Sequence, residues 1–386
     1  MRVVIDTGRL RMRPHSWWLR SLAAVDRFVD YRSLVPLRIA AGFLVLMHLE
    51  PFLRAAARGV IYRDRFYVPY QSWIPELPRS WYVTALILAA IGAVLLSVGL
   101  FTRAASVTTA AIVIYNLALS RTHYHHNRAF LAVLLVGLAL VPAGGAVSLD
   151  SWRARRAGRA ITTRARQWPL ILLRFQIAAV YVASGVSKLL DPDWVGGVVT
   201  RLRVGSALEV PGSVVPGFLL DVAVDPLVHA LVAPVIVLTE IFIGIGLLVR
   251  KTRVAAIWIA VVFHIAIEVS ANVQVFSWAA IAALVVWVAP IGRERTVSIG
   301  SGRPSAEHEA RAVRWLDWAG RFRVAVDSSG SRDVLLERAE RPPEAGTAAI
   351  LGVLRLLPAT FLAAVPLSVW RRQAVQSGSV TNRRPA

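Results

Sequence analysis

The sequence predicts an all-α, polytopic membrane protein with about eight transmembrane helices in one bundle and a small α+β C-terminal tail. Of its 386 residues, 56% are hydrophobic, and the mean hydropathy is +0.56, which is too apolar for a typical soluble domain. Several windows approach the roughly 20 apolar residues that a helix needs to cross a bilayer. Beyond Pro290 the chain becomes too charged for a membrane interior. These observations predict a membrane domain followed by an extramembrane segment.

Three regions are expected along the chain. Residues 1–32 are basic and aromatic, and Trp17 to Phe28 is expected to lie on the membrane surface as an interfacial helix. Residues 33–290 form the transmembrane domain, and residues 291–386 form a cytoplasmic tail. The periodicity and length of the apolar segments place the eight membrane helices at 33–53, 82–102, 104–120, 128–147, 168–188, 226–249, 254–271 and 273–290.

The tail is predicted to contain both strands and helices. Short apolar runs near Arg323 and after Asp333 are separated by a polar turn, a pattern typical of two short strands. Residues 347–370 are apolar but are interrupted by Arg355, Pro358 and Pro366. We therefore favour packed or interfacial helices there over a ninth membrane span.

Basic residues in the loops indicate the orientation, because Lys and Arg resist translocation. With the N-terminus inside, Arg103, the run from Arg153 to Arg166 and the Arg250-Lys251-Arg253 segment all fall on the cytoplasmic side. The acidic loop 189–225 falls outside, whereas the arginines of loop 54–81 go against the assignment. We expect a multi-pass protein of the cell membrane with both termini in the cytoplasm. Lys188, residues 121–128 and the 271–274 turn then share the outer end of the bundle and are expected to form one pocket.

The amino-acid composition also limits which binding partners are expected. The net charge of +21 is of the kind that attracts nucleic acid, but the arginines lie mostly in the N-terminal segment and in short loops, where a cytoplasmic membrane face places them. We expect the lipid bilayer as a partner and no nucleic acid. The absence of cysteine excludes disulfides, thiolate metal sites and thiol redox chemistry.

Lys188 is the first candidate site residue. It ends an apolar span and is followed by Asp191, Asp193 and Trp194. A lysine at this position commonly extends its amine to the membrane surface. In a partly desolvated protein pocket, however, the pKa of an amine falls, and the neutral form can accept a proton. Both interpretations stay open, and the Asp-Pro-Asp-Trp run is also typical of a turn followed by an interfacial anchor.

The segment Arg121 to Arg128 contains three histidines. On a helix only His123 and His126 share a face, and no carboxylate lies nearby. We therefore expect no metal, and interpret the segment as a hydrogen-bonding cluster at the outer rim.

Further polar residues interrupt the predicted membrane helices. His264 and Glu268 lie one helical turn apart, so they share a face that must point inward or into a wet cavity. His264 is either a site residue or a buried histidine bonded to a neighbouring helix. Arg174 and Glu240 are a candidate ion pair, acting as a structural clamp or as a substrate contact. Arg38 is expected to extend to the membrane surface. Asn272 and Gln274 mark the turn into the last span.

The stretch Leu173-Arg174-Phe175-Gln176-Ile177, with Tyr181, Gly185-Val186-Ser187-Lys188-Leu189 and Asp191-Pro192-Asp193-Trp194 after it, resembles the vitamin K-dependent gamma-carboxylase family. It also resembles the bacterial relatives of that family, the horizontally transferred transmembrane (HTTM) domain proteins. The chain departs from the family pattern at Ser187 and by one extra residue, Leu190. Phe263-His264 and Phe276-Ser277-Trp278 resemble a second family pair at the same separation. The resemblance covers about residues 33–290.

This resemblance implies an integral membrane enzyme in which Lys188 is the base. It places Arg128 where the family has a histidine that stabilises negative charge, and His126 is a neighbouring substitute. The expected reactants are a reduced naphthoquinone (menaquinol or vitamin K hydroquinone), O2, CO2 and a glutamate of a secreted peptide, with epoxidation of the quinol coupled to carboxylation. The expected substrate-binding residues are Arg174, Gln176, Asp191, Asp193, Trp194, Glu240, His264 and Glu268.

The tail departs from the animal carboxylases, which carry a large β-rich extramembrane part. It is faintly similar to the C-terminal half of DCC thiol-disulfide oxidoreductase-like domains, and is interpreted as a degenerate remnant without cysteine. Two alternatives to the carboxylase interpretation stay open. One is a non-catalytic membrane partner in maturation or export of a secreted peptide. The other is a quinone-linked membrane oxidoreductase that does not carboxylate.

Overall fold

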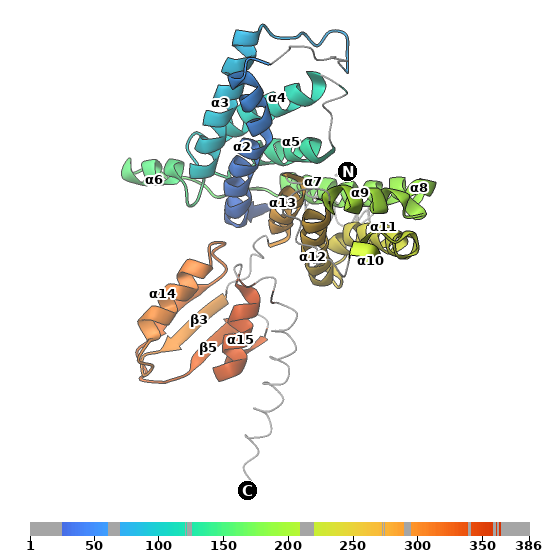
Figure 1. The fold of residues 1–386 in the computed structure, drawn as a ribbon. Coiled ribbons are helices and arrows are strands. Elements are labelled where there is room, and N and C mark those ends of the chain that lie inside the picture. Colours follow the sequence, from blue (N-terminus) through green and yellow to red (C-terminus); the bar gives the residue numbers. More distant parts are fainter. Residues whose placement is uncertain are drawn as a thin grey trace, which may run out of the picture.

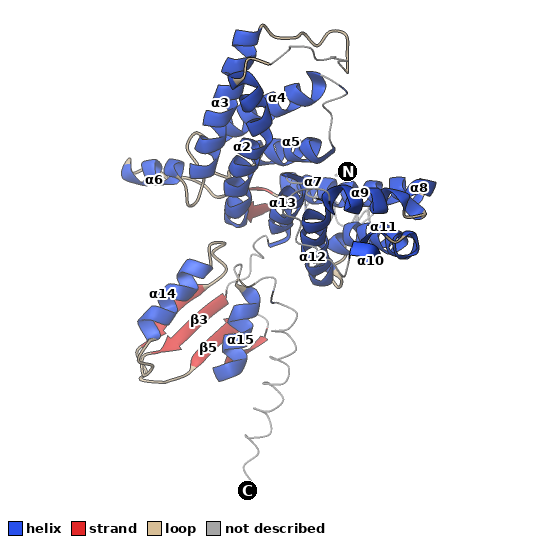
Figure 2. Cartoon of the chain, viewed as in Figure 1, coloured by secondary structure: helices blue, strands red, loops and turns tan. Residues whose placement is uncertain are grey.

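A computed structural model gives the fold (Figures 1 and 2). It describes residues 25–60, 70–119, 121, 126–208, 220–271, 273, 275–288, 295–338, 341–357, 360 and 363. His123, His125, Asn272, Gln274 and most of the basic N-terminal segment therefore lie outside the described residues, as does the side chain of His126.

The all-α membrane fold is confirmed. Each of the eight predicted spans contains a helix, and six helices are long and apolar enough to cross a membrane. The fourth and the last membrane helices are shorter. The helices are α2 (Val35–Ala57), α3 (Arg79–Val98), α4 (Thr102–Leu119), α5 (His126–Ala139), α7 (Trp168–Leu189), α11 (Pro226–Leu248), α12 (Arg253–Ala271) and α13 (Val275–Ala283), the last continued by the 3-10 helix η4 (Leu284–Val288).

The membrane helices form two neighbouring groups with one continuous core (Figure 1). Helices α2, α3, α4 and α5 pack together, and α7, α11 and α12 form the second group. Helix α13 contacts α2 and α5 as well as α12, so it joins the groups. Buried residues from both groups, such as Leu86 of α3 and Ile257 of α12, belong to the same apolar cluster.

The predicted span 128–147 is wrong at its C-terminal end. Helix α5 stops at Ala139, and turns and bends occupy the rest of the segment. The buried guanidinium of Arg38 donates hydrogen bonds to the carbonyls of Ala143, Ala146 and Val147 at 3.2, 3.3 and 2.7 Å. The interior position of Arg38 also corrects the expectation that it extends to the membrane surface. The N–H groups of Arg38 thus satisfy carbonyls that would have accepted backbone hydrogen bonds if α5 had continued as a helix.

Short elements connect the membrane helices. Strand β1 (Phe28–Asp30) pairs antiparallel with β2 (Arg164–Arg166), so the expected interfacial helix does not extend to Phe28. The 3-10 helix η1 (Arg32–Leu34) leads into α2, and α6 (Leu149–Arg156) projects sideways from the bundle (Figure 1). Helices α8 (Pro192–Val195), α9 (Val198–Leu208) and α10 (Leu220–Val224) lie between α7 and α11 in sequence.

The tail is a four-stranded sheet with two helices on one face. Its strands are β3 (Arg295–Gly300), β4 (Arg323–Asp327), β5 (Val334–Arg338) and β6 (Arg341–Ala345), in the order β4-β3-β5-β6. Helices α14 (Ala306–Leu316) and α15 (Gly346–Leu356) share one apolar cluster with the strands. The two predicted strands exist, but β3 separates them, pairing parallel with β4 and antiparallel with β5. Helix α15 packs on the sheet, as expected for the start of the 347–370 segment.

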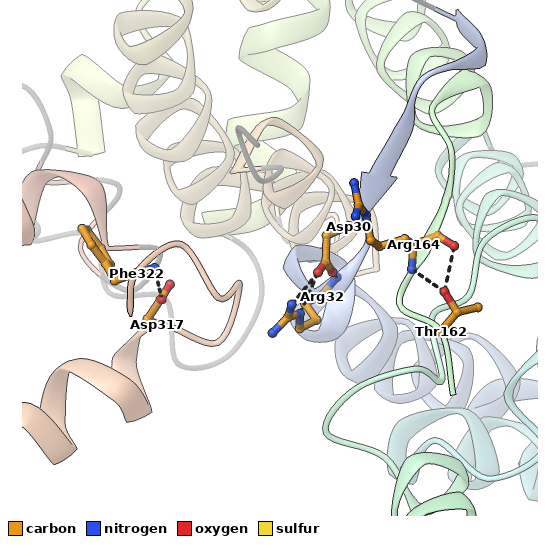
Figure 3. Close-up of polar contacts among 6 residues, drawn as sticks. All are labelled: Asp30, Arg32, Thr162, Arg164, Asp317 and Phe322. Atoms are coloured by element: carbon orange, nitrogen blue, oxygen red, sulfur yellow. Dashed lines mark hydrogen bonds and ion pairs between the residues drawn. The ribbon is translucent and has the colours of Figure 1, made fainter. Parts of the chain in front are cut away.

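The tail contacts the bundle at the end where β1 and η1 lie (Figure 3). Arg321 donates hydrogen bonds to the carbonyl of Leu356 at 2.8 Å and to that of Val288 at the end of η4. A Cβ atom at Gly320 would lie 2.6 Å from Nη1 of Arg32, so this turn of the tail touches η1. Asp317 holds the turn by accepting a 2.8 Å hydrogen bond from the Phe322 amide, and burial raises the pKa of Asp317.

Candidate active site

Helix α7 presents one buried stripe that carries the site. Leu173, Ile177, Tyr181 and Gly185 recur at intervals of four and are buried, as expected of the core-facing side of an amphipathic helix. Lys188 follows Gly185 by three residues and so continues this stripe. The amine is therefore directed toward α11 rather than toward lipid.

Two glycines bring α7 and α11 close together. A Cβ atom at Gly185 would lie 2.6 Å from Cγ1 of Ile241, and one at Gly244 would lie 2.6 Å from Cγ2 of Val182. Since the residue numbers run in opposite directions, the helices are antiparallel. This close packing sets Lys188 level with Glu240, the acidic residue of α11.

Lys188 and Glu240 form a buried ion pair. The Nζ atom of Lys188 lies 2.5 Å from Oε1 of Glu240, with side-chain exposures of 16% and 7%. Lys188 Nζ also donates to Oγ of Ser184 at 3.0 Å and lies 4.8 Å from the centre of the Trp194 ring. This geometry contradicts the interpretation of Lys188 as a lysine that reaches the membrane surface. The second oxygen of Glu240, Oε2, is buried and has no hydrogen-bond partner in the described part of the chain.

The pair lies at the end of α7 but well inside the length of α11. Asp225 caps α11 by accepting from the amides of Leu227 and Val228. Glu240 is 14 residues beyond Pro226, about 21 Å along the axis at about 1.5 Å per residue. Helices α8 and α9 fold back against α11, and α8 supplies the Trp194 ring. The 190–208 segment therefore covers the pair.

His264 and Tyr181 extend the site onto α12. The hydroxyl of Tyr181 lies 2.6 Å from Nε2 of His264, and both side chains are buried. The rings of Phe263 and Phe276 pack edge-on against the imidazole. Nδ1 of His264 has no hydrogen-bond partner among the described residues.

These side chains form one polar cluster inside an apolar core. Tyr181 lies within electrostatic range of Glu240, and His264 lies within range of Lys188. We refer to Tyr181, Ser184, Lys188, Trp194, Glu240 and His264 as the Lys188 cluster. It combines an amine, a carboxylate, a phenol and an imidazole, which are groups able to exchange protons.

The predicted pair of Arg174 with Glu240 is wrong. Arg174 donates through Nε and Nη2 to the carbonyl of Val286 at 3.1 and 2.8 Å. The register of α7 against α11 explains the difference. Val182 already contacts Gly244, and Arg174 precedes Val182 by two turns of α7, on the side away from Lys188. It therefore satisfies a carbonyl of η4, while Lys188 takes the carboxylate of Glu240.

Arg128 belongs to a different group of side chains from Lys188. Its guanidinium lies 5.4 Å from the ring centre of Phe52 on α2. The Phe130 and Phe276 rings meet edge-on at 5.9 Å, and Phe276 also contacts His264. Aromatic packing thus connects α5 with the Lys188 cluster, while the guanidinium of Arg128 itself lies over Phe52 of α2.

The remaining predicted site residues do not belong to the Lys188 cluster. Asp191 accepts a hydrogen bond from the Asp193 amide at 3.0 Å and caps α8, and Asp193 is exposed. Both match the turn interpretation of this run. Glu268 lies one turn beyond His264 on α12 and is partly buried. No group of three or more candidate metal-ligating side chains occurs within the described ranges.

Gln176 lines an apolar groove on the side of the bundle. The groove has a volume of about 400 Å³ and lies among α4, α5 and α7. Several of its lining side chains, including Val136 and Leu172, are exposed at the bundle surface. Other lining residues are Ile114, Leu117, Val133 and Gln176. The groove therefore faces the lipid and suits an apolar chain.

No site role was predicted for Tyr181, Ser184 or His48. Tyr181 and Ser184 precede Lys188 by seven and four residues, the spacing of one helix face, so that spacing was the available signal. His48 is fully buried in α2, and nothing in its neighbouring sequence marks it.

Fold and site together define a multi-pass membrane protein with an ionisable cluster inside its helical bundle. The family model of the HTTM domain matches residues 26–290, more than half of the chain. The chain therefore belongs to the HTTM domain family, which makes it a membrane protein related to the carboxylase family. No curated protein and no solved structure matches it.

Proposed function

We propose that this protein is an integral membrane enzyme that uses a reduced naphthoquinone, with the Lys188–Glu240 pair as the proton acceptor. The observation that carries the proposal is the buried contact of 2.5 Å between Lys188 Nζ and Glu240 Oε1. An ion pair with a purely structural role gains little over apolar packing, because both charges lose water. A cluster of ionisable groups in a covered site is a typical place for proton transfer.

The pair is suited to accept one proton from a bound hydroxyl group. In surroundings of low polarity, transfer of a proton from the ammonium to the carboxylate gives a neutral amine beside a neutral acid. The neutral amine then takes the hydroxyl proton, and the resulting ammonium balances the oxyanion left behind. Before the proton moves, Glu240 Oε2, with no described partner, is available to accept a hydrogen bond from the bound hydroxyl group.

Tyr181 and His264 support the same step. If the Tyr181 hydroxyl donates to Nε2 of His264, the imidazole carries its proton on Nδ1. That N–H group lacks a described partner, so it is available to donate to developing negative charge. The Phe263 and Phe276 rings hold the imidazole in place.

The groove beside Gln176 suits the apolar tail of a naphthoquinol. Gln176 lies 12 residues before Lys188 on α7, about 18 Å along the helix axis. A ring bound at the Lys188 cluster thus needs a long apolar chain to reach the groove. Menaquinol has such a chain.

In the overall reaction that we propose, quinol, O2, CO2 and a peptide glutamate are converted to quinone epoxide, carboxyglutamate and water. This equation balances. The naphthoquinol supplies the electrons that reduce O2. The tail is small and lies, in the proposed orientation, on the cytoplasmic side. In that orientation both termini are cytoplasmic and the protein is located in the cell membrane.

Purified protein in lipid nanodiscs, supplied with menaquinol, O2, a glutamate-containing peptide and ¹³C-bicarbonate, tests the proposal. Epoxide measured by mass spectrometry, together with ¹³C in the peptide, is the expected result. Quinol oxidation without epoxide or label would indicate a quinone-linked oxidoreductase. No quinol turnover, under conditions in which an authentic carboxylase is active, would contradict the enzyme and favour a non-catalytic partner.

A further inference from the structure

A second group of buried polar side chains lies among α2, α3, α4 and α5, and the proposed reaction does not use it. His48 of α2 is 1% exposed, and neither ring nitrogen has a hydrogen-bond partner in the described chain. A buried polar group without a partner is destabilising, because it has lost its hydrogen bonds to water. A buried imidazole whose two ring nitrogens lack partners therefore indicates that a ligand binds there.

Arg128 reaches the same place from α5. Its guanidinium lies 5.4 Å from the centre of the Phe52 ring, and that ring lies 5.5 Å from the ring of His48. His48 and Arg128 are also within electrostatic range of each other. The nearby acid Glu50 is paired with Arg54 on α2. Across the described ranges, no carboxylate is paired with Arg128.

Asn116 of α4 adds a third donor. It is 2% exposed, and its Oδ1 accepts a 2.8 Å hydrogen bond from the hydroxyl of Tyr82. Its Nδ2 is therefore a donor, and it has no partner in the described residues. Tyr82 is within electrostatic range of Arg128, which places the amide in the neighbourhood of the guanidinium.

The backbone adds to the positive character. Helix α5 begins at His126, so Arg128 lies in its first turn. The first amides of a helix have no partner within the helix, and the helix dipole is positive there. Guanidinium, amide and free helix amides are donors, and imidazole can donate as well. The missing partner must therefore be rich in acceptors and negatively charged.

We propose that His48, Asn116 and Arg128 bind a small oxyanion, such as a carboxylate, bicarbonate or a phosphate. The anion is either free in solution or the headgroup of an acidic lipid. Arginine suits this role because its planar fork binds two oxygens of one anion. The site lies on α2, α4 and α5, whereas the Lys188 cluster lies on α7, α8, α11 and α12. The inference does not depend on the proposed reaction.

Thermal unfolding of the purified protein in detergent, at constant ionic strength set with chloride, tests free anions. Bicarbonate, acetate and phosphate are titrated separately. At least one should raise the melting temperature in a saturable way, since a ligand that binds only the folded state stabilises it. Arg128→Gln and His48→Phe should weaken this binding at least roughly ten-fold. Arg128→Lys, which keeps the charge but loses the fork, should fold and show intermediate binding.

Arg121→Gln is the matched control. Arg121 also lies over an aromatic ring, that of Tyr70 at 5.6 Å, but it is exposed. This variant should bind the anion as the wild type does. The headgroup source is tested in nanodiscs with phosphatidylglycerol or phosphatidylcholine, where stabilisation by phosphatidylglycerol should disappear in Arg128→Gln. The proposal is overturned if neither a free anion nor phosphatidylglycerol stabilises the wild type, or if Arg121→Gln and Arg128→Gln lose equal binding.

Discussion

Lys188 on α7 and Glu240 on α11 hold their charged groups 2.5 Å apart inside the helical bundle. The Gly185 and Gly244 contacts set this distance, because a side chain at either position would push the two helices apart. Trp194 and the α8–α9 segment cover the pair from the side of the α7–α11 connection. The contact therefore links the helix packing to the chemistry that we propose.

Removing one member of the pair should destabilise the protein. Lys188→Met leaves the Glu240 carboxylate buried without its partner, and the expected loss is about 3–5 kcal/mol. Glu240→Met should cost a similar amount. The double variant Lys188→Met/Glu240→Met should regain most of the stability, since apolar groups of similar volume replace both charges. Unfolding in detergent measures all four proteins, and additive losses in the double variant would show that the two groups do not interact.

The Tyr181–His264 contact should affect turnover more than binding. Tyr181→Phe removes the hydroxyl that lies 2.6 Å from His264 Nε2, so the imidazole loses its orientation. We expect kcat for quinol oxidation to fall by roughly ten-fold or more, with little change in KM. His229→Asn is the control, because that buried imidazole contacts Thr200 and the Ala223 carbonyl, away from the cluster. It should lower stability but not kcat. Equal effects of both variants on kcat would contradict a role for Tyr181 in the site.

A larger side chain in the groove should impair substrates with a long apolar tail and leave tailless substrates unaffected. Val136→Trp places a large side chain in the cavity of about 400 Å³. We expect KM for long-tailed menaquinol to rise roughly ten-fold, while KM for a tailless naphthoquinol stays the same. Val94→Trp, at an exposed position of α3 outside the groove, should change neither constant. A rise in KM for both substrates would mean that the groove does not hold the tail.

Much of the membrane fold could be predicted because apolar length determines where helices cross a bilayer. The ends of helices depend on tertiary contacts, which the sequence does not display. Helix α5 stops before Leu140, where Arg38, about 100 residues earlier, takes the carbonyls of residues 143–147. The sheet order of the tail likewise depends on β3, which inserts between the two strands that the sequence indicated.

The candidate site was predicted only in part, for the same reason. Lys188 and Glu240 were recognised separately as ionisable residues in apolar segments. Their pairing depends on the register of α7 against α11. Gly185 and Gly244 set that register, and their contacts join residues more than 50 positions apart in the sequence. Without that register, Arg174 was an equally reasonable partner for Glu240. His48 could not be found, since a single histidine in an apolar helix gives no pattern.

The proposed orientation can be tested directly because the chain has no cysteine. Single cysteines at Leu190, beyond α7, and at Arg159, after α6, are both at exposed positions. A membrane-impermeant maleimide should label Leu190→Cys on intact cells and label Arg159→Cys only after permeabilisation. The opposite labelling would place the tail outside and reverse the orientation.

The central claim is that the Lys188–Glu240 pair performs the chemistry rather than only holding the helices together. The most direct test is epoxide formation from menaquinol by the double variant Lys188→Met/Glu240→Met, compared with wild type at equal folded concentration. We predict that the wild type forms epoxide and that the double variant, although its melting temperature is close to that of the wild type, forms none. Epoxide formation by the double variant at the wild-type rate would contradict the claim.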